Sequence, residues 1–105
     1  MQGVYLKFFM TELQKHNGEL LYEWLLEQAK KMGIPGGSAF RAIAGYGRHR
    51  KIHEETFFEL AGDVPIELSF YLNEMQAAQL LQLVKTEKLN LFYVKSQAEF
   101  CCNEE

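Results

Sequence analysis

Basic side chains and glycines are concentrated in residues 45–53, near the middle of the chain. The cluster contains Gly45, Gly47, Arg48, His49, Arg50, Lys51 and His53, and it is preceded by Arg41. Backbone N–H groups left free by glycines can cradle a phosphate, and arginines can bind it with paired hydrogen bonds. This combination on a long connecting segment favours an anionic ligand or a partner protein over a purely solvated loop, in which Glu54, Glu55 and Glu59 would balance the charge.

The two histidines of this segment allow a second chemistry. His49 and His53 are four residues apart, so on a helix they would share a face and could bind a metal ion. A third ligand with suitable spacing is missing apart from Glu54 or a distant cysteine. We therefore interpret His53 as a structural or ligand-contacting imidazole. His16 stands in an expected loop and is interpreted as an exposed residue.

A second glycine pair, Gly36 and Gly37, precedes the basic segment. The pair can supply a tight turn after a helix, or it can let a ligand approach the start of the following strand. Both interpretations stay open from the sequence. Gly36, Gly37, Arg41, Gly45, Gly47, Arg48, Arg50, Lys51 and His53 together form the predicted ligand site.

Length and charge limit the classes of protein. The chain has 105 residues and a net charge of −3, which predicts one domain, residues 1–105, with a core at about 3–97 and a loose tail at 98–105. A negative net charge argues against nucleic acid and anionic membranes as partners. Long apolar runs are missing, and Lys7 interrupts the first one, so neither membrane insertion nor a signal peptide is expected. Adjacent thiols at Cys101 and Cys102 favour a reducing, cytoplasmic setting.

Hydrophobic periodicity predicts six elements in the order βαββαβ. Asn17 is a candidate N-cap for the first helix, Gly33 a candidate C-terminal glycine, and Asn73 with Gln76 a candidate capping box for the second helix. Residues 48–63 are expected to be a long mobile loop, and residues 97–105 a loose tail. The predicted strands span residues 4–12, 38–46, 65–72 and 90–96, and the predicted helices span 19–32 and about 74–85.

This order predicts an α+β, ferredoxin-like sandwich with a four-stranded antiparallel sheet and two helices on one face. The other face would carry Tyr5, Phe9, Ile43 and Tyr71, which together are too apolar to remain in water. An exposed apolar patch of this kind is typical of an interface. We therefore expect a homo-oligomer whose subunits pack through their sheets.

The chain resembles the PII-like signalling proteins, and specifically their branch known as a domain of unknown function. The similarity spans roughly residues 3–96 and rests on four stretches of sequence. These are Leu20-Leu21-Tyr22 in the first helix, Gly33-Ile34-Pro35-Gly36-Gly37-Ser38, Gly45-Tyr46-Gly47 followed by Ile52-His53, and Asp63-Val64-Pro65.

The resemblance implies a PII-like homotrimer with ligand sites in the clefts between subunits. The segment after the second strand would correspond to the T-loop, which engages a regulated partner, such as a membrane transporter or channel, and responds to a bound nucleotide. PII proteins proper hold ATP phosphates with a glycine-rich loop after the second helix. Here Lys85–Asn90 contains no glycine. The ordinary ATP site is therefore not carried over, although an adenine nucleotide remains the candidate effector.

Other functions on the same architecture have less support. Nucleophile motifs are missing, so we expect no enzyme. Residues 13–18 do not match the phosphate loop of acylphosphatases, and the third predicted strand lacks the K/R-G-F motif of RNA-recognition domains. Two alternatives stay open, namely an adaptor oligomer without a small ligand and a metal-binding trimer similar to the CutA proteins.

Overall fold

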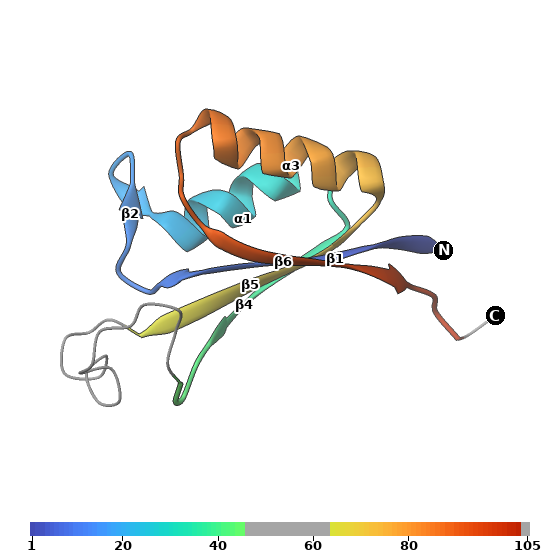
Figure 1. The fold of residues 1–105 in the computed structure, drawn as a ribbon, viewed down its shortest axis with the longest axis horizontal. Helices are drawn as coiled ribbons and strands as arrows, with labels where there is room; N and C mark the ends of the chain where they lie inside the picture. The colour runs from blue at the N-terminus through green and yellow to red at the C-terminus, as the bar shows by residue number, and fades with distance from the viewer. Residues whose placement is uncertain (46–63, 104–105) are drawn as a thin grey trace.

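The computed structural model describes residues 1–45 and 64–103. Four antiparallel strands form one sheet in the order β4-β5-β1-β6, and both helices lie on the same face of it (Figure 1). A two-residue hairpin, β2-β3, precedes the first helix. The ferredoxin-like fold class is thereby confirmed. The elements are β1 (Gln2–Thr11), β2 (Lys15–His16), β3 (Glu19–Leu20), α1 (Leu21–Lys31), β4 (Gly36–Arg41), β5 (Pro65–Leu72), α3 (Glu74–Thr86) and β6 (Phe92–Glu99).

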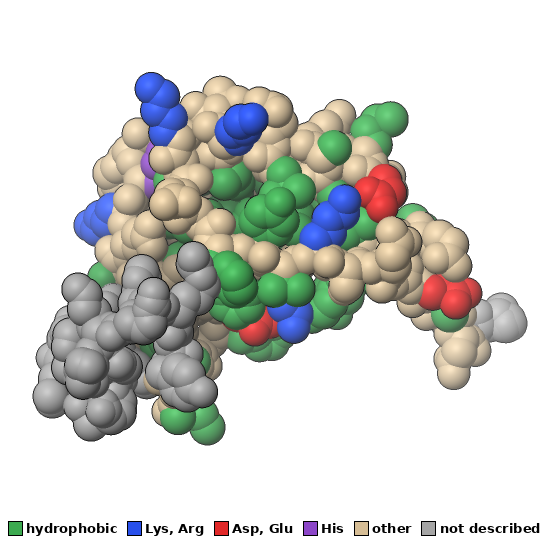
Figure 2. Space-filling view, viewed as in Figure 1, with side chains coloured by type: hydrophobic (Ala, Val, Ile, Leu, Met, Phe, Trp, Pro, Cys, Tyr) green, Lys and Arg blue, Asp and Glu red, His purple; other side chains and the backbone are tan. Residues whose placement is uncertain are grey.

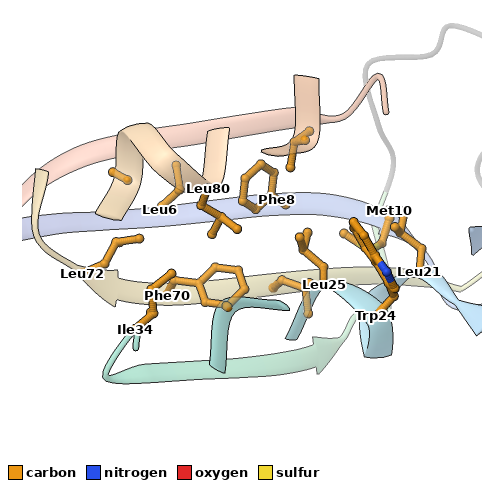
Figure 3. Close-up of a cluster of buried hydrophobic side chains, with 14 of the residues drawn as sticks. Leu6, Phe8, Met10, Leu21, Trp24, Leu25, Ile34, Phe70, Leu72 and Leu80 are labelled. Atoms are coloured by element: carbon orange, nitrogen blue, oxygen red, sulfur yellow. The ribbon is translucent and has the colours of Figure 1, made fainter. Parts of the chain in front are cut away.

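The central strand pair, β1 with β5, organises the core. Its register places Leu6 opposite Phe70 and Phe8 opposite Leu68, so alternate side chains of both strands point to the helices. Figure 3 shows Leu6, Phe8 and Phe70 in one cluster with Leu25 and Leu80 from the two helices. Phe8 and Phe70 contact edge to face with ring centroids 6.2 Å apart. The fully buried members are Val4, Leu6, Phe8, Leu21, Leu25, Leu68, Phe70, Leu72, Ala77 and Leu80.

Two predicted helix-end signals are confirmed, namely Gly33 at the C-terminus of α1 and the Asn73–Gln76 capping box at the N-terminus of α3. Gly33 has a φ of 80°, its N–H bonds Lys30 O at 3.0 Å, and the next N–H, of Ile34, bonds Ala29 O at 3.1 Å. This is a Schellman motif, which satisfies the last carbonyl groups of α1. The Asn73 side chain accepts from the Gln76 N–H, and the Gln76 side chain accepts from the Asn73 N–H, as in a capping box.

The prediction that Asn17 caps the first helix is wrong. Asn17 and Gly18 have φ values of 51° and 84° and form the two-residue turn of the β2-β3 hairpin. Asn-Gly is the preferred pair for such a turn, because both central residues need a positive φ. Helix α1 begins after Leu20 without a side-chain cap, and the Leu21 N–H bonds Gln14 O at 2.8 Å.

Several strand boundaries differ from the prediction. Strand β4 ends at Arg41, whereas the sequence predicted a strand reaching Tyr46. Strand β6 continues to Glu99, so residues 97–99 belong to the sheet and not to a loose tail. The reason is that β1 also begins earlier than predicted, and its Gln2 and Gly3 pair with Glu99 and Ala98. None of the helices that the structure describes is long and apolar enough to span a membrane.

The missing side chain of Gly37 allows a close approach between β4 and the core. A Cβ at this position would lie 2.8 Å from the Phe70 ring and 3.3 Å from Leu26. We expect Gly37→Ala to lower the free energy of unfolding by about 1–3 kcal/mol, because Phe70 would have to leave its packed position. Urea unfolding measures the change. Ser38→Ala, at the exposed neighbouring position, is the control and should stay within about 0.5 kcal/mol of wild type; equal stability of all three proteins would contradict the packing argument.

Candidate functional site

The structure describes four of the nine predicted site residues. Gly36, Gly37 and Arg41 lie in β4, and Gly45 lies four residues beyond its end. The other five lie outside the described residues, together with His49 of the metal hypothesis, and their assignment stays a prediction. These five are Gly47, Arg48, Arg50, Lys51 and His53.

Gly36 and Gly37 do not form a tight turn, because both are paired strand residues. Gly36 lies opposite Tyr71, and a Cβ on it would be 3.1 Å from the Tyr71 ring. Gly37 lies opposite Phe70, whose ring occupies the space of its missing side chain. The two glycines therefore make room for aromatic rings of the same chain. Since β4 is an edge strand and peptide groups alternate along it, Gly37 directs its N–H and C=O away from β5, whereas those of Gly36 point toward β5.

Arg41 is the last residue of β4. It is the one cationic residue of the predicted site that lies within the described ranges, and its side chain is exposed. Its Nε donates to Glu12 Oε1 at 3.3 Å, and its Nη2 donates to Glu12 Oε2 in a two-point ion pair. The Glu12 carboxylate raises the pKa of the Arg41 guanidinium, first through the hydrogen bond and second through its charge. The Arg41 side chain is nevertheless 62% exposed, so its remaining N–H donors reach solvent.

The sheet end around Arg41 is also the place where the chain leaves and re-enters the sheet. The N–H of Ala42 bonds Pro65 O at 2.9 Å, on the β4 side of β5. The N–H of Glu12 bonds Val64 O at 2.8 Å, on the β1 side. Two backbone bonds and the Arg41–Glu12 pair therefore hold the two ends of the connection between residues 42 and 64. Gly45, with a φ of 156°, is the last residue described on this side.

The sheet face away from the helices, called here the open face, is rich in aromatic side chains. Tyr5 and Tyr71 stack with ring centroids 5.2 Å apart, and the ring of Phe9 lies 5.5 Å from that of Phe92. Figure 2 shows hydrophobic side chains on the lower side of the sheet, opposite the helices. The face also includes Phe40 and Val94, and Tyr71, Phe40, Phe92 and Val94 are 41–55% exposed.

The predicted composition of the open face is correct except for Ile43. Tyr5, Phe9 and Tyr71 lie on it, whereas Ile43 lies beyond the end of β4 and is 96% exposed. At the centre of the face, Lys7 Nζ lies 3.5 Å from Glu67 and 5.1 Å from the centroid of the Tyr5 ring. Ser69 Oγ also donates to Glu67 Oε2 at 3.0 Å, so a small polar cluster lies in the middle of this aromatic-rich surface.

Phe100 adds an aromatic ring that sequence reasoning had assigned to the tail. Its ring lies 5.4 Å from that of Tyr71, over the position where Gly3 lacks a side chain. The backbone holds it there, because the Phe100 N–H bonds Met1 O at 2.8 Å and the Met1 ammonium donates to Phe100 O at 2.6 Å. The signal in the sequence was the aromatic residue Phe100, which lies diagonally across from Gly3 in the register of β6 with β1.

The turn after α3 replaces the glycine-rich loop of PII proteins with a closed helix end. The N–H groups of Lys88 and Leu89 bond the carbonyl groups of Lys85 and Val84, both at 3.0 Å. Lys88 takes the left-handed conformation, with a φ of 61°, that glycine usually occupies here. Because these amides already bond the helix, they are not free to cradle a phosphate.

A groove of about 330 Å³ runs beside this turn, between α3 and the edge strand β6. Hydrophobic side chains are visible in the hollow between the two elements (Figure 2). None of the predicted site residues that the structure describes contributes to it. Its lining residues are Ala78, Leu81, Gln82, Val84, Lys85, Leu89, Asn90, Leu91 and Tyr93.

His16 is not the exposed loop residue that the sequence indicated. Its side chain is only 12% exposed, and its ring meets Trp24 edge-on with centroids 4.5 Å apart. Its Nε2 lies 2.8 Å from Oε1 of Glu87, which follows the last turn of α3. His16 therefore ties the β2-β3 hairpin to both helices. Sequence spacing does not reveal this contact, because the partners are 71 residues apart.

Comparison with protein families decides the classification of the chain. The model of the DUF190 family, described as Uncharacterized ACR, matches residues 3–94. The chain belongs to the DUF190 family. A UPF0166 protein of Aquifex aeolicus is 34% identical over 80 residues, which cover 76% of each chain. A UPF0166 protein of Methanocaldococcus jannaschii is 34% identical over 61 residues, which cover 58% of this chain and 56% of the relative.

Solved structures similar to this DUF190 chain are PII-like, which confirms the resemblance drawn from the sequence. A PII-like signaling protein from Thermus thermophilus superimposes with a TM-score of 0.63 at 19% identity, covering 93% of this chain and 88% of that one. CPII, a nitrogen regulatory PII-like protein from Thiomonas intermedia bound to ADP, AMP and bicarbonate, gives 0.60 at 14% identity, covering 93% and 87%. At these identities the likeness concerns the fold.

The His16 contacts of the DUF190 chain can be separated by two substitutions. His16→Phe keeps a ring against Trp24 but loses the bond to Glu87, whereas His16→Ala loses both. We expect His16→Ala to lower the free energy of unfolding by about 1–3 kcal/mol, and His16→Phe to lower it less. Trp24 is the single tryptophan of the chain, so its fluorescence reports the change directly. Its emission should shift to longer wavelength in His16→Ala only; the same spectrum and stability in all three proteins would contradict the contact.

Proposed function

We propose that this DUF190 chain is a non-enzymatic, homotrimeric sensor in the cytoplasm. It binds a small anionic effector, an adenine nucleotide, in the clefts between subunits. Binding regulates a partner protein, such as a membrane transporter or channel, through the segment that follows β4. The observation that carries the proposal is the exposed guanidinium of Arg41 at the sheet end where the basic, glycine-flanked segment leaves the sheet.

The similar structures support the choice of effector. CPII of Thiomonas intermedia is bound to ADP and AMP in two of its structures, together with bicarbonate in one and acetate in the other. Its fold is that of the present chain, with TM-scores of 0.60 and 0.59. A nucleotide phosphate is a tetrahedral anion and a small carboxylate is a planar one. A guanidinium can bind either with paired hydrogen bonds. Arg41 is suited to either.

The proposed site differs from the glycine-loop site of PII proteins. The Lys88 and Leu89 amides of the turn after α3 bond the end of that helix, so we place the anion at the opposite edge of the sheet, along β4. The outward-facing backbone of Gly37 would contribute on the same edge, about 13 Å from Arg41 along β4, where it would meet another part of the nucleotide. The remaining contacts are assigned to Gly45, Gly47, Arg48, Arg50, Lys51 and His53.

The open face supports assembly into a trimer. Aromatic side chains such as Tyr71 and Phe92 remain about half exposed on it, whereas the opposite face is covered by helices. Burying such a surface against other copies removes apolar area from water at about 25 cal/mol per Å². Closing three subunits around an axis would bring the β4 end of each one to a subunit boundary. The effector would then bind between subunits and shift the population of segment conformations that fit the partner.

The nucleotide proposal is tested by calorimetric titration of the full chain with ADP, AMP and ATP, and with pyrophosphate as a simple anion. We expect saturable binding that Arg41→Gln weakens about tenfold, because a charge-assisted hydrogen bond is lost. Lys30→Gln, an exposed cation at the end of α1, is the matched control and should bind as wild type does. If the wild-type chain binds none of these anions at millimolar concentration, the sensor proposal is wrong and an adaptor without a small ligand is favoured.

The assembly is tested by sedimentation equilibrium. We expect a trimer for the wild-type chain and dissociation in Phe40→Glu, because the new carboxylate would lie opposite Glu67 and be buried on the open face without a cationic partner. Met75→Glu places the same charge on an exposed apolar residue of α3, on the helix side, and should leave the trimer intact. A stable wild-type monomer, or equal dissociation of both variants, would rule out packing through the open face.

A further inference from the structure

The Arg41–Glu12 pair crosses over a whole strand. Arg41 lies opposite Ile66 on β5, and Ile66 in turn lies opposite Met10 on β1. Strands β4 and β1 are therefore about 10 Å apart, with β5 between them. Arg41 shares a sheet face with the buried Ile66, so its side chain spans β5 on the helix side to reach Glu12, two residues after Met10. The pair thus connects two strands that do not touch each other.

The chemistry of the pair resembles that of a bound anionic ligand. A carboxylate presents two oxygen atoms to Nε and Nη2 of the guanidinium, as a phosphate group would. The partners are unequally placed, because the Arg41 side chain is 62% exposed and that of Glu12 is 23% exposed. An incoming anion can therefore approach the guanidinium from solvent, and it must displace Glu12 to bind Nε and Nη2 together.

We propose that Glu12 is an internal competitor of the anionic effector. Its carboxylate occupies Arg41 in the free protein, and a phosphate group of the effector takes its place on binding. This inference rests on the proposed function, because it concerns the same guanidinium. It adds the mechanism by which binding is sensed, namely the exchange of an internal carboxylate for an external anion.

The exchange has a direct structural consequence at the β4 end of the sheet. The Glu12–Arg41 ion pair lies beside two backbone hydrogen bonds at this end of the sheet. These bonds run from the Glu12 N–H to Val64 O and from the Ala42 N–H to Pro65 O. When the anion removes the ion pair, the two backbone bonds are the ones of these three that still hold residues 42 and 64. These residues begin and end the connection that carries the basic cluster, so the loosening acts where a partner would be engaged.

The matched variants are Glu12→Gln, Glu12→Asp and Glu27→Gln, each made in the full chain. Glu12→Gln removes the competing charge. Glu12→Asp keeps the charge but shortens the reach across β5 by one methylene group. Glu27→Gln makes the same change of net charge on the exposed side of α1. Circular dichroism and urea unfolding establish that each variant is folded.

Calorimetry with pyrophosphate and with ADP measures the competition. We expect both Glu12 variants to bind about three- to fivefold more tightly than wild type, as the loss of an exposed ion pair allows. Glu27→Gln should match wild type. Amide hydrogen exchange gives a second readout: the Ala42 N–H should exchange faster in both Glu12 variants without ligand, and in wild type only after ligand is added.

The outcomes separate this inference from the proposed function. Wild-type binding with unchanged or weaker binding in the Glu12 variants overturns the competitor role and leaves the sensor intact. Equal tightening in Glu27→Gln attributes the effect to net charge and also overturns it. Unchanged Ala42 exchange in the Glu12 variants removes the structural coupling. Absence of binding in every protein, wild type included, overturns the sensor and the competitor together.

Discussion

The antiparallel pairing of β1 with β5 is the constraint on which the other features depend. Because side chains alternate along a strand, one register sends Phe8 and Phe70 to the helices and Tyr5 and Tyr71 to the open face. A shift by one residue would exchange the two sets and expose the core. Together with the register of β4 on β5, it also sets the distance between Glu12 and Arg41, which flank the start of β5. The core, the open face and the candidate site therefore all depend on this pairing.

Much of this pairing was predictable from the sequence, because strands β1 and β5 alternate clearly and α3 carries both a capping box and an apolar stripe. Predictions failed where one local signal has two meanings. Asn17 suits a helix N-cap and a hairpin turn equally, and the following Gly18 favours the turn. The far end of β6 was missed because its residues are polar and their strand pairing comes from Gln2 and Gly3, almost a hundred residues away.

The candidate site was predictable only in part. Glycines and cations indicated an anion site, but a residue's partner depends on register and side-chain reach, which spacing does not encode. Glu12 and His16 each meet their partner through such contacts, with Arg41 29 residues away and Glu87 71 residues away. The glycine pair at residues 36 and 37 shows the opposite difficulty, since small residues that suggest a ligand are also required where aromatic rings of the same chain come close.

The left-handed conformation of Lys88 has a consequence for the rigidity of the fold. Glycine in this position would sample many backbone angles, whereas a lysine has a narrow left-handed well and a cost of about 1–2 kcal/mol for occupying it. The surrounding hydrogen bonds must hold Lys88 in this conformation, so the turn between α3 and β6 is rigid. The angle between the end of α3 and the chain leading to β6 is therefore fixed by the backbone of this turn.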